Sequence, residues 1–383
     1  MPPLKFSTIL LMLFLHYIGL ATCGSNSTAR RITNERRWFS LLPVPANGDL
    51  PDRDKAAWPP VYELDSARHR VTVHAVRYCF IRGSDYDSVN DVLRRAIEMW
   101  EPAMQMSLLR FRPGNKVGGR GNICGEPGMR SDAVQIEQGY GKTATSVGYN
   151  YASSRERRHY MKFTRRDQTR VTKSDYSNMA HELGEPALLS KSTEHSADSG
   201  EGHAIGFYHE FARPDRNQHV DFRCENLFDY DRVKHEIETA PHAPGHDTIE
   251  LACRDANVAN EYGFSALNYV PWDETRAMWT QWSRKFDRES IMMYHWRAGA
   301  KKGANAVWPD DAVLLGKEAD GSKYRTFEGG IEDPEAPEIS AGDIVRVAQL
   351  YPDPNNARAA GIVRLPEWQP VEPNYWMGVD TVS

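Results

Sequence analysis

The most regular hydrophobic pattern in the chain lies just before residue 101. Apolar side chains recur there at helical spacing and form one stripe, which consists of Val89, Val92, Leu93, Ala96, Ile97 and Trp100. Ser88 is a suitable N-cap for this stripe, and Pro102 is a suitable stop because proline lacks the amide that a helix interior needs. The pattern therefore predicts a helix between Ser88 and Pro102.

A second helix is predicted over residues 341–350. Ser340 is placed to cap it, and the apolar residues on one side are Ile344, Val347, Ala348 and Tyr351. Strands are predicted over 70–81, 107–111, 133–136 and 145–149, where β-branched and aromatic residues gather between Gly and Pro turns. The chain therefore begins its ordered part with strands and one long helix.

The ends of the chain differ from this region. Residues 1–23 combine Lys5, an apolar run and small residues up to Cys23, which is typical of a cleavable signal peptide. A retained anchor is the alternative, although the run is short and interrupted by polar residues. Residues 24–60 are polar and predict a pro-segment or linker, residues 61–352 a single folded domain, and residues 353–383 a Pro-rich tail.

Composition adds limits on the compartment and the partners. The 383 residues are 40% hydrophobic and 26% charged, which is typical of a globular protein, and the net charge of -5 gives no reason to expect nucleic acid or an anionic membrane. We predict no nucleic-acid partner and no membrane anchor. A secreted, extracellular chain without Cys23 keeps four cysteines, which allow three pairings. Proximity favours Cys79 with Cys124 and Cys224 with Cys253.

The candidate chemistry lies in two stretches. HELG occupies residues 181–184 and HAIGFYHEFARPDR occupies residues 203–216. If they were joined directly, they would contain the complete motif H-E-x-x-H-x-x-G-x-x-H of zinc-dependent proteases. The eighteen residues 185–202, here called the insertion, separate them.

The spacing of this motif has a physical reason. Histidines four positions apart on a helix share one face and can direct imidazole nitrogens at one metal ion. We therefore predict one catalytic Zn²⁺ held by His181, His203 and His209, with one position left open, and Glu182 as the general base that takes a proton from water. Gly206 is expected to end the helix in a left-handed turn that lets His209 return to the metal.

The extended stretch HEFARPDR (209–216) resembles the signature of the astacin family of metzincin proteases. Residues SIMMY (290–294) resemble its Met-turn, although the family usually has histidine where this chain has Met293. The resemblance implies that Met292 packs beneath the metal, that Tyr294 is a switchable zinc ligand that stabilises the oxyanion, and that Glu210 contacts the matured N-terminus.

The same resemblance implies an α+β fold with two lobes. An N-terminal sheet with helices and a more irregular C-terminal lobe would face each other across a cleft lined by the active-site helix and the Met-turn. Polypeptide substrates would bind in extended form, partly by strand addition along the rim of the cleft. Asp49, in an Asn-Gly-Asp stretch, faintly resembles the aspartate that occupies the zinc in a zymogen, but the stretch equally fits a simple turn.

The insertion leaves three interpretations open. We favour a translated in-frame intron, in an artefact or splice variant, because removing these residues restores the motif without any other change. In the second interpretation, a natural insertion leaves a catalytically inactive secreted pseudoprotease or binding module, because the insertion contains Pro186 and would not continue a helix. In the third and least favoured, His195 replaces His181 as a ligand beside His203 and His209.

Overall fold

The fold was obtained as a computed structural model. It describes residues 39–41, 55–114, 122–140, 143–146, 148–150, 157–165, 170–184, 204–239, 248–272, 280–282, 285–326 and 339–356. The chain divides into residues 1–35 and residues 36–383, and all of the described residues belong to the second unit.

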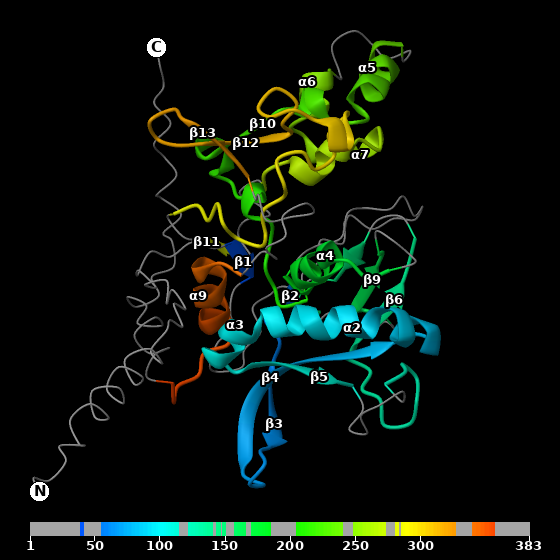
Figure 1. The fold of residues 1–383 in the computed structure, drawn as a ribbon, viewed down its shortest axis with the longest axis vertical. Helices are drawn as coiled ribbons and strands as arrows, with labels where there is room; N and C mark the ends of the chain where they lie inside the picture. Colours follow the sequence, from blue (N-terminus) through cyan, green and yellow to red (C-terminus); the bar gives the residue numbers. More distant parts are fainter. Residues whose placement is uncertain are drawn as a thin grey trace, which may run out of the picture. The chain divides into compact units, whose positions relative to one another are not determined.

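A mixed six-stranded sheet dominates the N-terminal part (Figure 1). Its strands are β3 (Pro60–Leu64), β4 (Arg70–Phe80), β5 (Leu109–Pro113), β6 (Val134–Gln138), β7 (Ala144–Thr145) and β9 (Tyr160–Phe163). β4 pairs in parallel with β5 and β6, and β6 pairs in parallel with β9. β3 and β7 pair antiparallel with β4 and β9, and both lie at ends of the strand order.

Two further strand pairs connect distant parts of the chain. β1 (Phe39–Leu41) pairs with β11 (Thr280–Trp282), and β2 (Lys55–Ala56) pairs with β8 (Tyr149–Asn150). Ala57 and Trp58, directly after β2, are buried in the hydrophobic core. Residues 55–58 therefore pack with the folded part of the chain, although they fall within the predicted pro-segment or linker.

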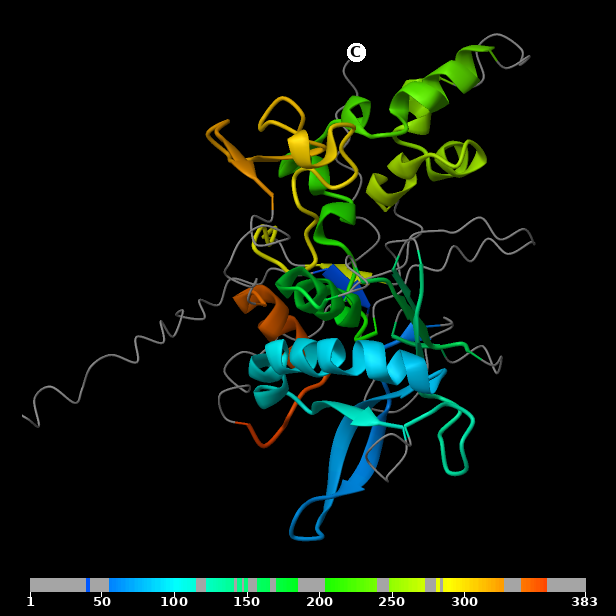
Figure 2. The ribbon, with the colours of Figure 1, turned by 45° about the vertical axis from the view of Figure 1, so that its right-hand side comes forward.

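Helices α2 (Gly83–Met99) and α4 (Lys173–Gly184) lie side by side and pack against the sheet (Figures 1 and 2). The predicted stripe is confirmed, since Val89, Val92, Leu93 and Ala96 are buried. The predicted start at Ser88 was wrong. The helix begins at Gly83 because the buried carboxylate of Asp85 accepts the Arg82 amide at 3.0 Å, and the Arg82 guanidinium donates to the same carboxylate at 3.0 Å.

Pro102 ends α2 only in part. After Trp100 the chain enters a second short helix, α3 (Glu101–Gln105), in whose first turn Pro102 lies. Proline is tolerated there because the amide that it lacks would have no partner within the helix.

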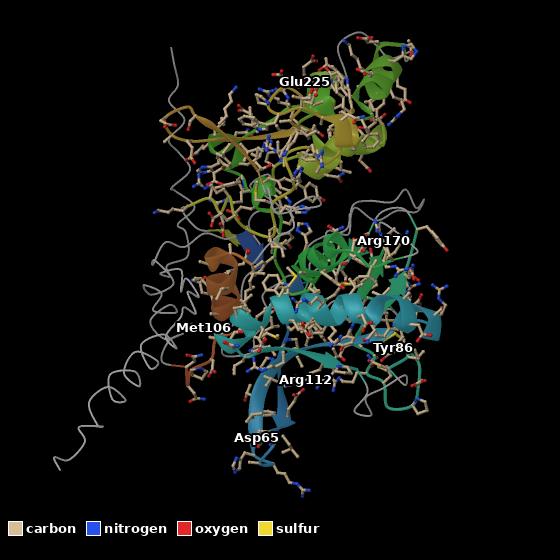
Figure 3. The ribbon with its side chains drawn as sticks, viewed as in Figure 1. Asp65, Tyr86, Met106, Arg112, Arg170 and Glu225 are labelled. Carbon is tan, nitrogen blue, oxygen red and sulfur yellow. A yellow bond between two sulfur atoms is a disulfide. The ribbon has the colours of Figure 1, made fainter. Side chains whose placement is uncertain are left out.

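The predicted strand over 145–149 is divided into β7 and β8, whereas the strand over 70–81 is confirmed as β4. Figure 3 places Asp65 at the turn between β3 and β4.

The C-terminal part is more irregular. Its α-helices and strands are β10 (Val220–Phe222), α5 (Tyr230–Thr239), α6 (Ile249–Ala252), α7 (Ala256–Glu261), β12 (Leu314–Lys317), β13 (Lys323–Arg325) and α9 (Ala341–Leu350). Its 3₁₀ turns are η1 (Glu210–Ala212), η2 (Arg216–Gln218), η3 (Cys224–Asn226), η4 (Ser265–Tyr269) and η5 (Gly303–Asn305). The strands form a small sheet in the order β10-β12-β13. α9 has the predicted bounds and the predicted cap, Ser340.

Two large clusters of buried side chains form the core. One joins the sheet with α2, α4 and α9 and includes Leu183, Ile205, Ile291 and Met292. The other fills the C-terminal part and includes Phe211, Tyr269 and Met293, with Tyr294 packed against it. His209 therefore lies between residues of the two clusters, since Phe207 belongs to the first and Phe211 to the second. Met292 lies likewise between Ile291 of the first cluster and Met293 of the second.

Two disulfides are present, Cys79–Cys124 and Cys224–Cys253. They match the pairing that proximity in the chain favoured. The described residues contain no helix with the length and apolar character needed to cross a bilayer.

His159 gives the fold a dependence on pH. The ring is buried against Trp58 and Tyr149; its Nε2 accepts the amide of Asn150 at 2.9 Å, so its Nδ1 donates to the Asp132 carbonyl at 3.0 Å. This pattern requires the neutral ring, and burial lowers the pKa of His159 to about 4.

We predict that acidification destabilises the fold through this residue. His159 binds the additional proton below pH ~6.5 in the unfolded chain and only below about pH 4 in the folded chain. As the pH falls from ~6.5 to about 4, the free energy of unfolding should therefore decrease by up to about 3 kcal/mol. Urea unfolding of the native chain and of His159→Gln from pH 7 to pH 4 measures this. The variant should show a smaller loss; an equal loss would contradict the prediction.

Candidate active site

α4 presents two of the predicted site residues, His181 and Glu182, in its last turn. The helix starts in a reciprocal cap, because the Thr172 amide donates to Asp175 at 2.7 Å and the Asp175 amide donates to the Thr172 hydroxyl at 3.2 Å. Its other face is buried in the core, and the indole of Trp100 donates to the Ala180 carbonyl at 2.9 Å. The last turn of the helix is thereby held in a fixed position.

One backbone hydrogen bond joins the end of α4 to the described residues that follow the insertion. The amide of Ile205 donates to the carbonyl of Leu183 at 3.1 Å. If residues 185–202 are left out of the count, this bond joins positions i and i+4, which is the hydrogen bond of an uninterrupted α-helix. Leu183 and Ile205 are therefore bonded in the register that an uninterrupted helix would give them.

Further contacts hold the residues that directly follow the insertion. The Tyr351 hydroxyl donates to the Ile205 carbonyl at 2.8 Å, and the Trp58 indole donates to the Ala204 carbonyl. Ala204, Ile205 and Phe207 are all buried. These contacts come from both ends of the domain, so the position of the chain after the insertion is set by tertiary packing.

Gly206 has a φ of +91°, as the sequence predicted for the residue that ends the helix. A side chain is strained in this left-handed region, which explains the glycine. The turn leads to His209, which is buried, stacks on Phe211 with ring centroids 4.5 Å apart, and faces Tyr294 edge-on at 4.5 Å. The left-handed turn therefore brings His209 back toward α4.

Four predicted residues gather at this place. The ring centroids of His181 and His209 are 5.8 Å apart, and those of His181 and Tyr294 are 5.9 Å apart. Glu182 is near enough to raise the pKa of Tyr294, after the larger effects of burial and of Tyr269. Met292 is buried in a hydrogen-bonded turn in which the Met293 amide donates to the Ser290 carbonyl at 3.0 Å.

Both histidines are held neutral. Burial lowers the pKa of His209, and burial is also the largest cause of the lowered pKa of His181, where a proton on both neighbouring rings would be unfavourable. His181 Nδ1 contacts the carbonyl oxygen of Ile291, which can only accept, so Nδ1 carries the hydrogen and Nε2 keeps its lone pair. Neutral imidazoles with one nitrogen fixed by a hydrogen bond are the form in which histidine binds metals.

Glu182 is buried, and Thr145 is its partner. The hydroxyl of Thr145 in β7 donates to Glu182 Oε2 at 2.7 Å. Burial raises the pKa of Glu182 to about 8, and this hydrogen bond opposes the rise. Since a nearby cation favours the charged carboxylate, a metal at the histidines would lower the pKa again and leave a base able to take a proton.

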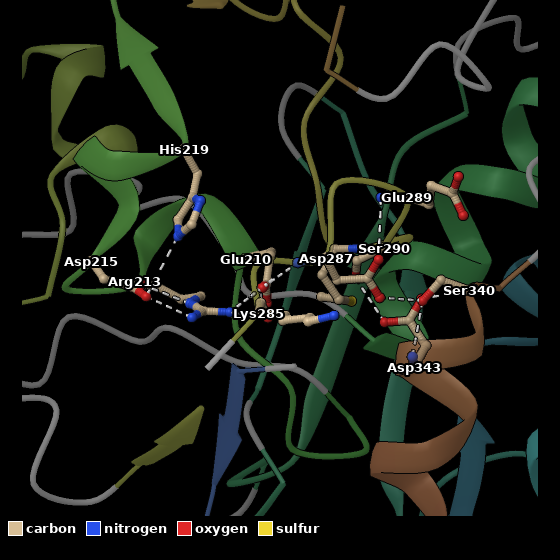
Figure 4. Close-up of polar contacts among 11 residues, drawn as sticks. Glu210, Arg213, Asp215, His219, Lys285, Asp287, Glu289, Ser290, Ser340 and Asp343 are labelled. Atoms are coloured by element: carbon tan, nitrogen blue, oxygen red, sulfur yellow. Dashed lines mark hydrogen bonds and ion pairs between the residues drawn. The ribbon is translucent and has the colours of Figure 1, made fainter. Parts of the chain in front are cut away.

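Glu210 lies in a buried polar network shown in Figure 4. Its Oε1 accepts the guanidinium of Arg213 at 2.5 Å and the amide of Asp287 at 2.8 Å. Arg213 also donates to Asp215 at 2.7 Å, so one guanidinium is shared by two carboxylates. Its expected contact with a matured N-terminus stays a prediction.

The donors that the structure brings together, two imidazoles and a phenol, are of the N and O kinds that zinc accepts. Among the described residues, no group of three or more His, Cys, Asp or Glu side chains is placed to hold a metal ion. The proposed third histidine, His203, lies outside the described residues, as do Asp49 and His195. Two of the three predicted ligands are thus placed, in a form that suits the metal.

Sequence reasoning missed two contacts at this site. Thr145 lies 37 positions from Glu182, and the Ile291 carbonyl lies 110 positions from His181. Thr145 falls in a predicted strand, but no local pattern marks a strand residue as the partner of a distant carboxylate. Only the pairing of β7 with β9 at the edge of the sheet brings the hydroxyl to α4.

No protein-family model matches the chain, and no curated protein matches it. Among solved structures it is similar to high choriolytic enzyme 1, a hatching enzyme zinc-protease from Oryzias latipes (medaka fish), with 15% identity over 73% of this chain and 90% of that chain and a TM-score of 0.37. Two structures of myroilysin each share 16% identity over 73% of this chain, covering 93% and 83% of their own chains, with TM-scores of 0.36 and 0.34. At these scores the similarity carries no argument, so the site has to be judged from its own residues.

We predict that deleting residues 185–202 preserves the fold. Because the Ile205–Leu183 hydrogen bond already has helical register, joining Gly184 to His203 needs no rearrangement of the described flanks. The free energy of unfolding should rise by about 2 to 3 kcal/mol, since the cost of closing a loop of this length is removed. Denaturant unfolding measures the change.

The matched control keeps the loop length and changes its order. A variant with residues 185–202 shuffled should unfold like the native chain if the insertion acts only as a connection. A deletion variant that is unfolded, or less stable than the native chain, would show that the insertion itself supports the domain.

Proposed function

We propose that this protein is a secreted zinc-dependent metalloendopeptidase of the astacin type. The observation that carries the proposal is the meeting of the two halves of the motif: the Ile205–Leu183 hydrogen bond restores helical register, and His181, Glu182, His209 and Tyr294 gather beside it. The motif spacing supplies the remaining candidate, because His203 directly precedes the described stretch that carries Gly206 and His209. We propose His203 as the third ligand.

Each residue has a defined task in this proposal. His181, His203 and His209 hold the metal through neutral imidazole nitrogens. Zinc, when bound, supplies a Lewis acid that polarises the scissile carbonyl and makes water more acidic. Glu182 takes the proton from the attacking water and delivers it to the departing amine. The Tyr294 phenol, which burial keeps protonated by raising its pKa, donates a hydrogen bond to the developing oxyanion.

The proposed substrates are polypeptides bound in extended form. β7 lies at the end of the strand order, and its Thr145 contacts the proposed base, so a peptide added to that edge would lie beside Glu182. The two disulfides suit an oxidising, extracellular compartment. A signal peptide in residues 1–23 and a zymogen held by Asp49 remain parts of the proposal.

The insertion favours a second candidate, an inactive secreted pseudoprotease or binding module. Ordering a chain that contains eighteen extra residues between two ligands costs conformational entropy that an uninterrupted helix does not pay. In that case the fold would be retained while the metal or the turnover is lost. Assays of the chain as written and of the chain without residues 185–202 separate the two candidates.

We predict one zinc ion per chain and hydrolysis of an unfolded protein substrate that stops when a chelator is added. Glu182→Gln should lower kcat by about 10²- to 10⁴-fold because the general base is lost, and it should leave the zinc content unchanged because Glu182 is not a ligand. His209→Ala should lose the zinc. Metal analysis and a fluorescent protein-digestion assay measure both properties.

If both the full chain and the shortened chain bind zinc and neither hydrolyses any polypeptide, the binding-module candidate replaces the protease. Zinc and turnover in the shortened chain alone would identify the insertion as the inactivating element.

Thr145 provides a further prediction. Thr145→Val keeps the shape of the side chain and removes the hydroxyl that holds Glu182 Oε2, so kcat should fall about tenfold with KM unchanged, in whichever chain is active. Thr145→Ser restores the hydroxyl and is the matched control. Equal kcat values for the three proteins would show that the hydrogen bond does not position the base.

A further inference from the structure

One buried carboxylate, that of Asp343, connects α9 to Ser290 (Figure 4), in the turn whose Ile291 carbonyl contacts His181. Its Oδ2 accepts the amide of Ser340 at 3.0 Å, which completes the capping box of α9. The same oxygen accepts the amide of Ile291 at 3.0 Å, and Oδ1 accepts the hydroxyl of Ser290 at 2.7 Å. Capping accounts for the first of these bonds and leaves the other two without a role.

The two additional bonds lead to His181. The Ser290 hydroxyl donates to Asp343 and accepts the amide of Met292 at 3.0 Å. That amide and the carbonyl of Ile291 belong to the same peptide unit, and this carbonyl accepts the hydrogen of His181 Nδ1. An unbroken series of hydrogen bonds therefore runs from the carboxylate through a hydroxyl and a peptide unit to the imidazole.

Because each hydrogen bond in the series points toward Asp343, the series makes the Ile291 carbonyl a stronger acceptor for His181. A hydroxyl that donates to a carboxylate becomes a stronger acceptor, and a peptide whose amide donates becomes a stronger acceptor at its carbonyl. A strong, fixed acceptor opposite Nδ1 keeps the hydrogen on that nitrogen and fixes the plane of the ring. The Ile291 amide, held directly by Asp343, prevents the turn from rotating away.

We infer that Asp343 is a positioning residue for His181, which it holds in the Nδ1–H tautomer through Ser290 and the peptide unit between Ile291 and Met292. The consequence for metal binding rests on the proposed function, in which His181 is a zinc ligand. The orientation of the His181 ring does not rest on the proposed function, because every hydrogen bond in the series joins two described residues and needs no metal.

The network next to this series offers a matched control. Ser340 accepts the Asp343 amide at 2.9 Å through its hydroxyl and donates the hydroxyl to Asp287 at 2.5 Å. Ser340→Ala therefore weakens the cap of α9 and removes a partner of Asp287, but it removes no hydrogen bond of the series from Asp343 to His181. A purely structural role of Asp343 would make Asp343→Asn and Ser340→Ala behave alike.

The experiment compares the full native chain with Asp343→Asn, Ser290→Ala and Ser340→Ala. Asn at position 343 has the same size, but its amide group donates where Ile291 or Ser290 needs an acceptor. Ser290→Ala breaks the series and leaves the bond between Asp343 and the Ser340 amide intact. Nitrogen-15 NMR of the histidine rings in the metal-free chain reports the tautomer, with the His181 signals assigned by their absence from His181→Asn. Competition with a coloured chelator reports the zinc Kd.

We expect the Nδ1–H signature of His181 in the native chain and in Ser340→Ala, and a mixture of tautomers in Asp343→Asn and Ser290→Ala. The zinc Kd of the latter two should rise about 10- to 100-fold, as for other groups that orient metal-bound histidines. An unchanged tautomer in folded Asp343→Asn and Ser290→Ala would overturn the inference. If the tautomer changes as expected but neither the native chain nor the chain without residues 185–202 binds zinc, the inference stands and the proposed protease function fails.

Discussion

The hydrogen bond from the Ile205 amide to the Leu183 carbonyl is the interaction on which the site depends. A metal site of this type needs its ligands at fixed positions, because a loose arrangement costs ordering entropy whenever the ion binds. Helical register normally supplies this order through the chain itself. Here tertiary packing supplies it at the described flanks, since Tyr351 and Trp58 fix the carbonyls of Ile205 and Ala204. These contacts weaken the objection that the insertion separates His181 from His203 and His209 in the sequence.

The candidate site lies where two hydrophobic clusters meet, and this position has consequences for its chemistry. Leu183 and Met292 belong to one cluster, whereas Phe211 and Met293 belong to the other. Side chains between them are removed from water, which lowers the pKa of the two histidines and raises that of Glu182. The same burial would be costly for unpaired polar groups. The network around Glu210, Arg213, Asp287 and Asp343 offsets that cost by pairing nearly every oxygen with a donor.

α9 connects this network to the rest of the domain. It is buried along most of its length, and its Ser340 and Asp343 reach the turn that contains Met292. A helix near the end of the described chain thus stabilises a turn that precedes it by about fifty positions. Its Tyr351 reaches the residues after the insertion as well, so one helix supports both parts of the candidate site.

Local sequence determined those features that local physics encodes. The bounds and cap of α9, the strand β4 and the buried stripe of α2 follow from side-chain periodicity and capping, and the disulfide pairing followed proximity in the chain. The sequence also marked His181, Glu182, His209 and Tyr294 as candidates, and it predicted the left-handed turn at Gly206. The tertiary structure decided how these pieces meet. The register across the insertion, the bond from Thr145 to Glu182 and the series from Asp343 to His181 join residues far apart in the chain. Such contacts arise from the packing of whole helices and strands, and that is why no local pattern could predict them.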